Sequence, residues 1–188
     1  PFDCGDLSYF FPLMAATERR LGFRPRFGAF DAAFDAFYVY EFFDRGDEPG
    51  FAAVPFVLKG GPKRLFDRNG LPLCKADLSM PLKFTYMARK SVRVPHRKAR
   101  HVCPLFFPEP TGEVCPIDDP HFAKGGCKTT LADSIGARIR HQLDRDSKAY
   151  KEIYKQRTAT ERINSQAKTL GIERPRLRNG QAIANYNT

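Results

Sequence analysis

Apolar side chains recur every three or four residues between Asp6 and Leu21, and Gly22 then supplies a stop signal. This pattern predicts a helix that packs on a sheet. The short apolar run from Arg26 to Phe30 follows and predicts a strand, which ends at Asp31.

The next hydrophobic segment, 34–43, follows no strict alternation and predicts a second helix. After a turn cluster at 45–50, the run from Phe51 to Leu58 predicts a buried strand, although Pro55 argues against a central position. This order of helices and strands is typical of an α/β layer with a mainly parallel sheet. Asp31 would then lie at the C-terminal end of a strand, where ligands collect in open α/β sheets.

Glycines and prolines are frequent from Lys59 onward and break any long element. We interpret residues 59–143 as an irregular, basic, Cys- and Pro-rich insertion between two parts of one core, residues 1–58 and 144–188. No Gly or Pro occurs from Arg145 to Leu170, which predicts a long helix that Gly171 ends. A last helix is predicted from Gln181.

The composition fits a soluble protein with one domain, or one domain with an insertion. The chain has 188 residues, of which 42% are hydrophobic, so it can build a core. No apolar run approaches the roughly 18 residues that a membrane span requires. Because the sequence begins at Pro1 without a leader, we expect it to be a piece of a longer product.

The net charge of +10 favours a polyanionic partner, most often nucleic acid. No acidic residue occurs between Leu78 and Pro108, where seven cations lie: Lys83, Arg89, Lys90, Arg93, Arg97, Lys98 and Arg100. One interpretation is a surface that contacts phosphates, for which Arg93, Arg97, Lys98 and Arg100 are the candidates. The other is a solvated basic loop.

Four functional side chains share one stripe of the long helix. At 100° per residue, Tyr154, Arg157, Glu161 and Lys168 fall within an arc of roughly 60°. A neighbouring arc is apolar and is expected to bury against a sheet. Its members are Ile153, Ala159, Ile163, Ala167 and Leu170.

The spacing Tyr-x2-Arg-x3-Glu-x6-Lys of this stripe resembles the signature of bacterial insertion-sequence transposases with a DDE catalytic triad. The segment 30–36 (Phe-Asp-Ala-Ala-Phe-Asp-Ala) resembles the family's Asp-Ala-x-Tyr-Asp segment around the second catalytic Asp, with Phe34 in place of the usual Tyr. The resemblance runs on through 124–127 and 178–180. It implies an RNase H-like fold with the second Asp, Asp31, on a strand and Glu161 on a later helix, after an insertion of variable length. The family's first catalytic Asp has no counterpart here, so the N-terminal strands of the core are expected to be missing.

The resemblance also implies a chemistry. DNA cleavage and strand transfer at the terminal inverted repeats of the element would use two Mg²⁺ or Mn²⁺ ions, held by Asp31, Glu161 and the missing Asp. Tyr154, Arg157 and Lys168 would contact the DNA backbone. The implied partners are transposon-end and target DNA and a second copy in a synaptic homodimer, in the bacterial cytoplasm and on the nucleoid.

Each of these residues also has a plain structural interpretation. Asp31 could be a turn residue and Asp35 a helix-start residue, Glu161 and Arg157 a surface ion pair, and Tyr154 an aromatic at the rim of the core. We assign Asp31 and Glu161 to the site and keep Asp35 structural.

Two other functions remain compatible with the residues. One is a catalytically inactive, basic DNA-binding relic of a transposase, and the other is a related RNase H-like nuclease.

Five cysteines in a chain without a leader favour a reducing compartment, where they are free thiols or metal ligands. Cys74, Cys103, Cys115 and Cys127 all lie in the expected insertion and could close a tetrahedral Zn²⁺ site. No Cys-x2-Cys pair occurs, so separate thiols are the alternative. A Cys/His nucleophile has no local signature here.

Overall fold

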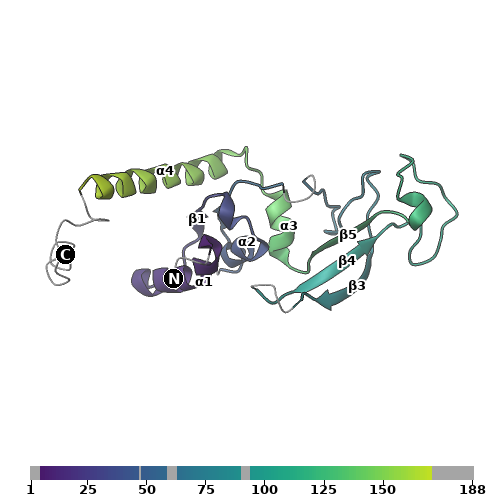
Figure 1. Ribbon diagram of the computed structural model, residues 1–188, viewed down its shortest axis with the longest axis horizontal. Helices are drawn as coiled ribbons and strands as arrows, with labels where there is room; N and C mark the ends of the chain where they lie inside the picture. The colour runs from purple at the N-terminus through teal and green to yellow at the C-terminus, as the bar shows by residue number, and fades with distance from the viewer. Residues whose placement is uncertain (1–4, 47, 59–62, 90–93, 171–188) are drawn as a thin grey trace.

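The computed structural model describes residues 5–46, 48–58, 63–89 and 94–170 and has a mixed α/β fold (Figure 1). The N-terminal part contains η1 (Asp6–Tyr9), α1 (Phe10–Leu21), β1 (Phe27–Ala29), η2 (Ala32–Phe34), α2 (Phe37–Asp44) and β2 (Phe51–Ala53). The later part contains β3 (Leu82–Met87), β4 (Arg97–Val102), η3 (Phe122–Lys124), β5 (Lys128–Ala132), α3 (Ile135–Gln142) and α4 (Lys148–Thr169). The helix predicted from Gln181 lies outside the described residues. None of the helices described is long and apolar enough to cross a membrane.

The N-terminal part is built around a parallel strand pair. β1 and β2 pair in parallel, with Phe27 opposite Phe51, which confirms the parallel arrangement predicted for these two strands. The core beside them is made of Phe10, Met14, Val39, Tyr40, Phe43, Ala52 and Val54. Gly22 adopts φ 75° after α1, so the predicted stop signal is also confirmed. β2 ends at Ala53, shorter than predicted, since Pro55 has no N–H to continue the ladder.

The region expected to be an irregular insertion contains a regular sheet, so that part of the prediction was wrong. β3, β4 and β5 form a three-stranded antiparallel sheet in the order β3-β4-β5 (Figure 1). The sheet is therefore not part of a mainly parallel layer. Pro81 and Pro95 lie just before β3 and β4, where a proline costs no ladder hydrogen bond.

α3 lies within the segment predicted as the insertion, and it packs on the N-terminal core. A side chain at Gly136 would place its Cβ 2.0 Å from the carbonyl oxygen of Phe37, so α3 and α2 meet backbone to backbone. Ser134 caps α3 by accepting from the Gly136 N–H and donates to the Glu41 carboxylate at 2.7 Å. Residues 135–142 thus belong with α2.

α4 begins at Lys148, three residues later than predicted, because the Ser147 side chain caps it by accepting from the Tyr150 N–H. Its first half contacts β1 and β2. The second half projects from the core, and every residue from 158 to 166 is exposed (Figure 1). The predicted burial of the apolar arc was therefore wrong for Ala159 and for Ile163, which is 63% exposed, and for Leu170. Ile153 and Ala167 are half-buried.

Candidate functional site

Asp31 lies directly beyond β1, at the C-terminal end of the parallel pair. Its side chain caps η2, since Oδ1 accepts from the Ala33 N–H at 2.9 Å. The side chain is half-buried, and its second carboxylate oxygen has no hydrogen bond in the described part of the chain. Asp31 is therefore oriented by the turn and retains an oxygen that can bind a cation or a solvent molecule.

Asp35 is, by contrast, the centre of a buried polar network. Its carboxylate accepts from the Tyr40 hydroxyl and the Val57 N–H, each at 2.7 Å. Arg140 on α3 donates to both oxygens, from Nε at 2.8 Å and Nη2 at 2.6 Å. The side chain of Asp35 is completely buried, and these four bonds use its acceptors fully. Asp35 therefore joins η2, α2 and α3 as a structural residue.

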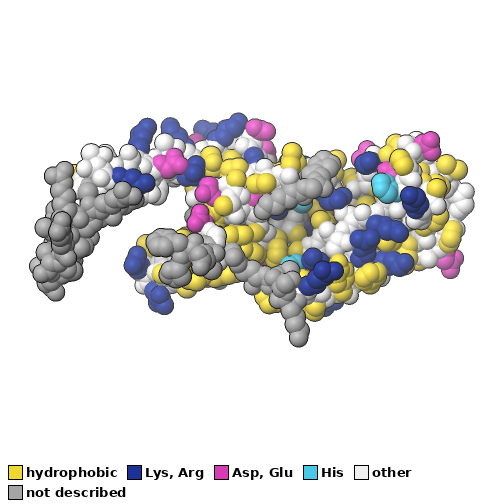
Figure 2. Space-filling view, viewed as in Figure 1, with side chains coloured by type: hydrophobic (Ala, Val, Ile, Leu, Met, Phe, Trp, Pro, Cys, Tyr) yellow, Lys and Arg dark blue, Asp and Glu magenta, His cyan; other side chains and the backbone are white. Residues whose placement is uncertain are grey.

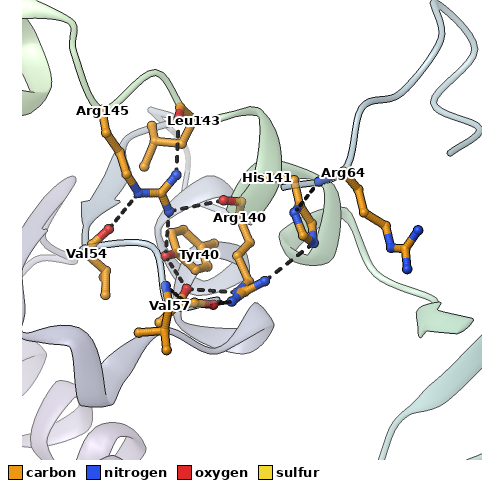
Figure 3. A network of polar contacts seen from close by, with 9 residues as sticks. Tyr40, Val54, Val57, Arg64, Arg140, His141, Leu143 and Arg145 are labelled. Carbon is orange, nitrogen blue, oxygen red and sulfur yellow. Dashed lines mark hydrogen bonds and ion pairs between the residues drawn. The ribbon is translucent and has the colours of Figure 1, made fainter. Parts of the chain in front are cut away.

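A second arginine extends this network toward α4. Arg145 donates to the carbonyl oxygens of Val54 at 2.9 Å and Arg140 at 3.0 Å, and to the Tyr40 hydroxyl at 2.9 Å (Figure 3). Burial, together with the hydrogen bond to Asp35, raises the pKa of Tyr40 well above its usual range. Sequence reasoning missed both arginines, because neither occurs in a recognisable motif.

His141 lies at the edge of the same network (Figure 3). Its Nδ1 accepts from the Arg64 N–H at 3.1 Å, which requires that nitrogen to be deprotonated. Burial and the neighbouring charges of Arg140 and Arg64 lower the pKa of His141 to about 4. The ring is thus neutral at physiological pH and acts as a buried acceptor.

The four signature residues all lie on α4, as the spacing predicts. Tyr154 stacks on Tyr150, with ring centroids 5.8 Å apart and planes 12° from parallel, so its ring covers the rim of the core. Arg157 pairs with Glu161 at 2.8 Å, and Glu161 is 55% exposed. Lys168, near the C-terminal end of the same helix, is exposed. The plain interpretations of Tyr154 and Glu161 therefore describe real contacts.

Asp31 and Glu161 do not meet in this structure. Glu161 lies on the projecting half of α4, which stands clear of the body of the molecule (Figure 2). No interaction between the two side chains occurs, and no group of three His, Cys, Asp or Glu side chains is arranged to hold a metal ion, in the part of the chain that the structure describes. A shared metal site requires the far half of α4 to approach the end of β1.

The basic residues of β4 point to opposite faces of the antiparallel sheet. Lys98 and Arg100 lie opposite Tyr86 and Phe84 in the register, so these four side chains share one face. Arg97 lies on the other face, where it pairs with Asp133 at 3.7 Å and donates to Thr85. Arg97 therefore does not share a face with Lys98 and Arg100, and Arg93 lies outside the described residues.

Three of the four cysteines of this region come together. The thiol of Cys127 interacts with those of Cys103 and Cys74, and burial together with these two neighbours raises the pKa of Cys127 to about 12. Cys115 is not among the main contributors to the raised pKa of Cys127, and none of the four cysteines forms a disulfide. We call Cys74, Cys103 and Cys127 the thiol cluster. Of the four cysteines expected as possible zinc ligands, the structure brings these three together.

Comparisons of the chain with protein-family models, with curated protein sequences and with solved structures find no match.

Proposed function

We propose that the chain is part of the catalytic domain of a metal-dependent DNA transposase with an RNase H-like core. The observation that carries the proposal is the placement of the signature. Asp31 follows the first strand of a parallel pair, and the helix of Tyr154, Arg157 and Glu161 packs on that same pair. Asp31 and the α4 helix, more than a hundred positions apart in the sequence, are thereby both attached to the β1–β2 pair.

The uncovered apolar surface of this unit supports the proposal. β1 pairs only with β2 among the described residues, so its other edge can accept a strand. Leu13, Leu21 and Phe23 on and beyond α1 are 51%, 49% and 63% exposed. Ile163 on α4 is exposed as well. Strands that carry the first catalytic Asp would add to β1 and cover these side chains, and α4 would then lie against a complete sheet.

The roles of the residues follow from their chemistry. Two divalent ions, when bound, would activate the attacking oxygen and stabilise the leaving one. The carboxylates of Asp31 and Glu161 are the hard oxygen donors that Mg²⁺ and Mn²⁺ prefer, so the donor chemistry fits. Glu161 would exchange its contact with Arg157 for the metal, and Arg157 would then be available for a phosphate. With two of three carboxylates, this chain alone is expected to be inactive.

The experiment is a Mg²⁺- or Mn²⁺-dependent nicking assay on DNA that carries the ends of the element, using the full reading frame with the first Asp. Glu161→Gln should abolish cleavage and leave DNA binding nearly intact, because a metal ligand is lost and the basic surfaces are unchanged. Glu152→Gln is the matched control, since Glu152 is an exposed carboxylate on the same helix and pairs with Lys148 as Glu161 pairs with Arg157. Equal cleavage by both variants would contradict the proposal.

A second candidate, a nucleic-acid-binding chain without catalysis, is favoured by one face of the antiparallel sheet. Phe84 and Tyr86 are 50% and 42% exposed, with ring centroids 5.8 Å apart, and Lys98 and Arg100 lie beside them. Exposed aromatic rings next to cations bind bases by stacking and phosphates by charge.

This surface has an internal control for the binding test. Both Lys98→Ala and Phe84→Ala should weaken binding to single-stranded DNA. Lys98→Ala should also reduce the slope of log K against log salt concentration by the equivalent of about one phosphate contact. Arg97→Ala changes a cation on the opposite face of the same strand and should have little effect. If Arg97→Ala weakens binding as much as Lys98→Ala, this face is not the binding surface.

A further inference from the structure

The thiol cluster is assembled from three separate segments of the chain. Cys74 lies in a tight turn, in which its N–H donates to the Leu78 carbonyl at 3.0 Å and its own carbonyl accepts from Asp77 at 3.1 Å. Cys103 follows the last residue of β4, and Cys127 precedes the first residue of β5. Val102 at the end of β4 pairs with Lys128 at the start of antiparallel β5. Cys103 and Cys127, one residue beyond this pair, therefore lie at the same end of the sheet.

The backbone around Cys127 is adapted to this close approach. Gly126 adopts φ +77°, and a Cβ added there would lie 2.4 Å from the Cβ of Cys103 and 2.9 Å from its sulfur. Only glycine allows both this conformation and this contact. The sequence Gly125-Gly126-Cys127 therefore brings the chain tightly around Cys103, which is itself buried.

The cluster opens onto a cavity that contains a histidine. Cys74 and Cys127 line a cavity of about 440 Å³ together with Asp119 and His121. Oδ1 of Asp119 lies 2.8 Å from Nδ1 of His121, which leaves the other ring nitrogen, Nε2, available. A carboxylate that holds Nδ1 in this way is the usual partner of a histidine that binds zinc through Nε2.

We propose that Cys74, Cys103 and Cys127 bind a zinc ion, with Nε2 of His121 as the fourth ligand. Three thiolates and one imidazole form one of the ligand sets of structural zinc sites. The side chain of His121 is 71% exposed, so its ring can turn toward the thiols. The four side chains are not in ligating positions in this structure, so zinc binding would have to draw them closer together. This inference is independent of the proposed transposase activity.

A zinc ion at this position would have a structural role. It would tie the loop of Cys74 and the 119–127 segment to the end of the antiparallel sheet. Zinc would bind these cysteines as thiolates, so binding would release their protons to solvent and would depend on pH. The site lies at the end of the sheet remote from α4, away from Glu161 (Figure 1).

The first test needs no variant. The purified chain is treated with a thiol-alkylating reagent with and without one equivalent of Zn²⁺, and modified cysteines are identified by mass spectrometry. We expect zinc to protect Cys74, Cys103 and Cys127 and to leave Cys115 modified at an unchanged rate. Protection of Cys115 together with the other three would overturn the proposed ligand set, and protection of none would overturn the site.

The second test uses Co²⁺ as a spectroscopic probe. The wild-type chain should show thiolate-to-cobalt charge-transfer bands and the d–d bands of a tetrahedral ion. Cys103→Ser should lose them, and Cys115→Ser, the matched control, should keep them. Asp119→Asn should weaken metal affinity about 10- to 100-fold through the orientation of His121. An unchanged spectrum and affinity in His121→Ala would overturn the assignment of the fourth ligand.

Discussion

Among the ion pairs of the described residues, that between Asp35 and Arg140 has the most buried side chains and should be the most costly to disrupt. Asp35→Asn keeps the size of the side chain and removes its charge. The side chains of Asp35 and Arg140 are 0% and 15% exposed, so the guanidinium would remain in the interior without a counter-ion. The amide would also present an NH₂ group where Arg140 and the Val57 N–H both donate.

The magnitude follows from burial and not from distance. Removing one partner of a buried ion pair costs about 3–5 kcal/mol. Arg26 and Glu48 form an ion pair with the same 2.6 Å separation, but their side chains are 50% and 70% exposed. An exposed pair contributes about 0–1 kcal/mol. Glu48→Gln is therefore a control in which an ion pair of the same length is disrupted at the surface.

The assay is urea denaturation at pH 7, followed by circular dichroism, for the wild type and both variants. We expect a loss of about 3–5 kcal/mol in the free energy of unfolding for Asp35→Asn and less than about 1 kcal/mol for Glu48→Gln. Losses of similar size in the two variants would refute the argument from burial. A cost below about 1 kcal/mol for Asp35→Asn would contradict the assignment of Asp35 as a structural residue.

Two further predictions concern His141 and Gly126. The pKa of His141 is about 4 in the folded chain and 6.5 when unperturbed. Between these two pH values the unfolded state therefore binds more protons than the folded state. The free energy of unfolding should fall as pH is lowered from 6.5 to 4. At about 1.4 kcal/mol per pH unit the loss approaches roughly 3 kcal/mol, and a His141→Gln variant that keeps the same slope in that window would contradict this origin. Gly126→Ala should destabilise the chain more than Gly112→Ala does. Both glycines have positive φ, but only at Gly126 would the added Cβ collide with Cys103. Thermal denaturation compares the two variants, and equal shifts in Tm would count against tight packing at the thiol cluster.

Local signals predicted the N-terminal part of the fold well. Gly22 ends α1 because glycine tolerates the left-handed conformation, and the short apolar runs around 27 and 51 pair in parallel as the alternation of helices and strands implies. The placement of Asp31 beyond β1 follows from that order.

Long-range contacts account for what the sequence did not predict. Prolines at 81 and 95 suggested an irregular region, but they stand just before strands whose pairing joins residues as far apart as Lys98 and Ala132. Arg140 and Arg145 have no local motif, and only the fold brings them to Asp35 and Tyr40. The helical period placed Ile163 on an apolar arc correctly, but periodicity does not show whether a partner surface covers that arc.

The most direct test of the proposed site is whether Asp31 and Glu161 bind the same ion. In the full reading frame that includes the first Asp, Mn²⁺ binding is measured by electron paramagnetic resonance for the wild type, Asp31→Asn, Glu161→Gln and the double variant, with Glu152→Gln as control. If the two carboxylates share an ion, each single variant weakens binding, the double variant loses little more than either one, and the control binds as the wild type does. Independent, additive losses, or unchanged binding in both single variants, would contradict the transposase site proposed here.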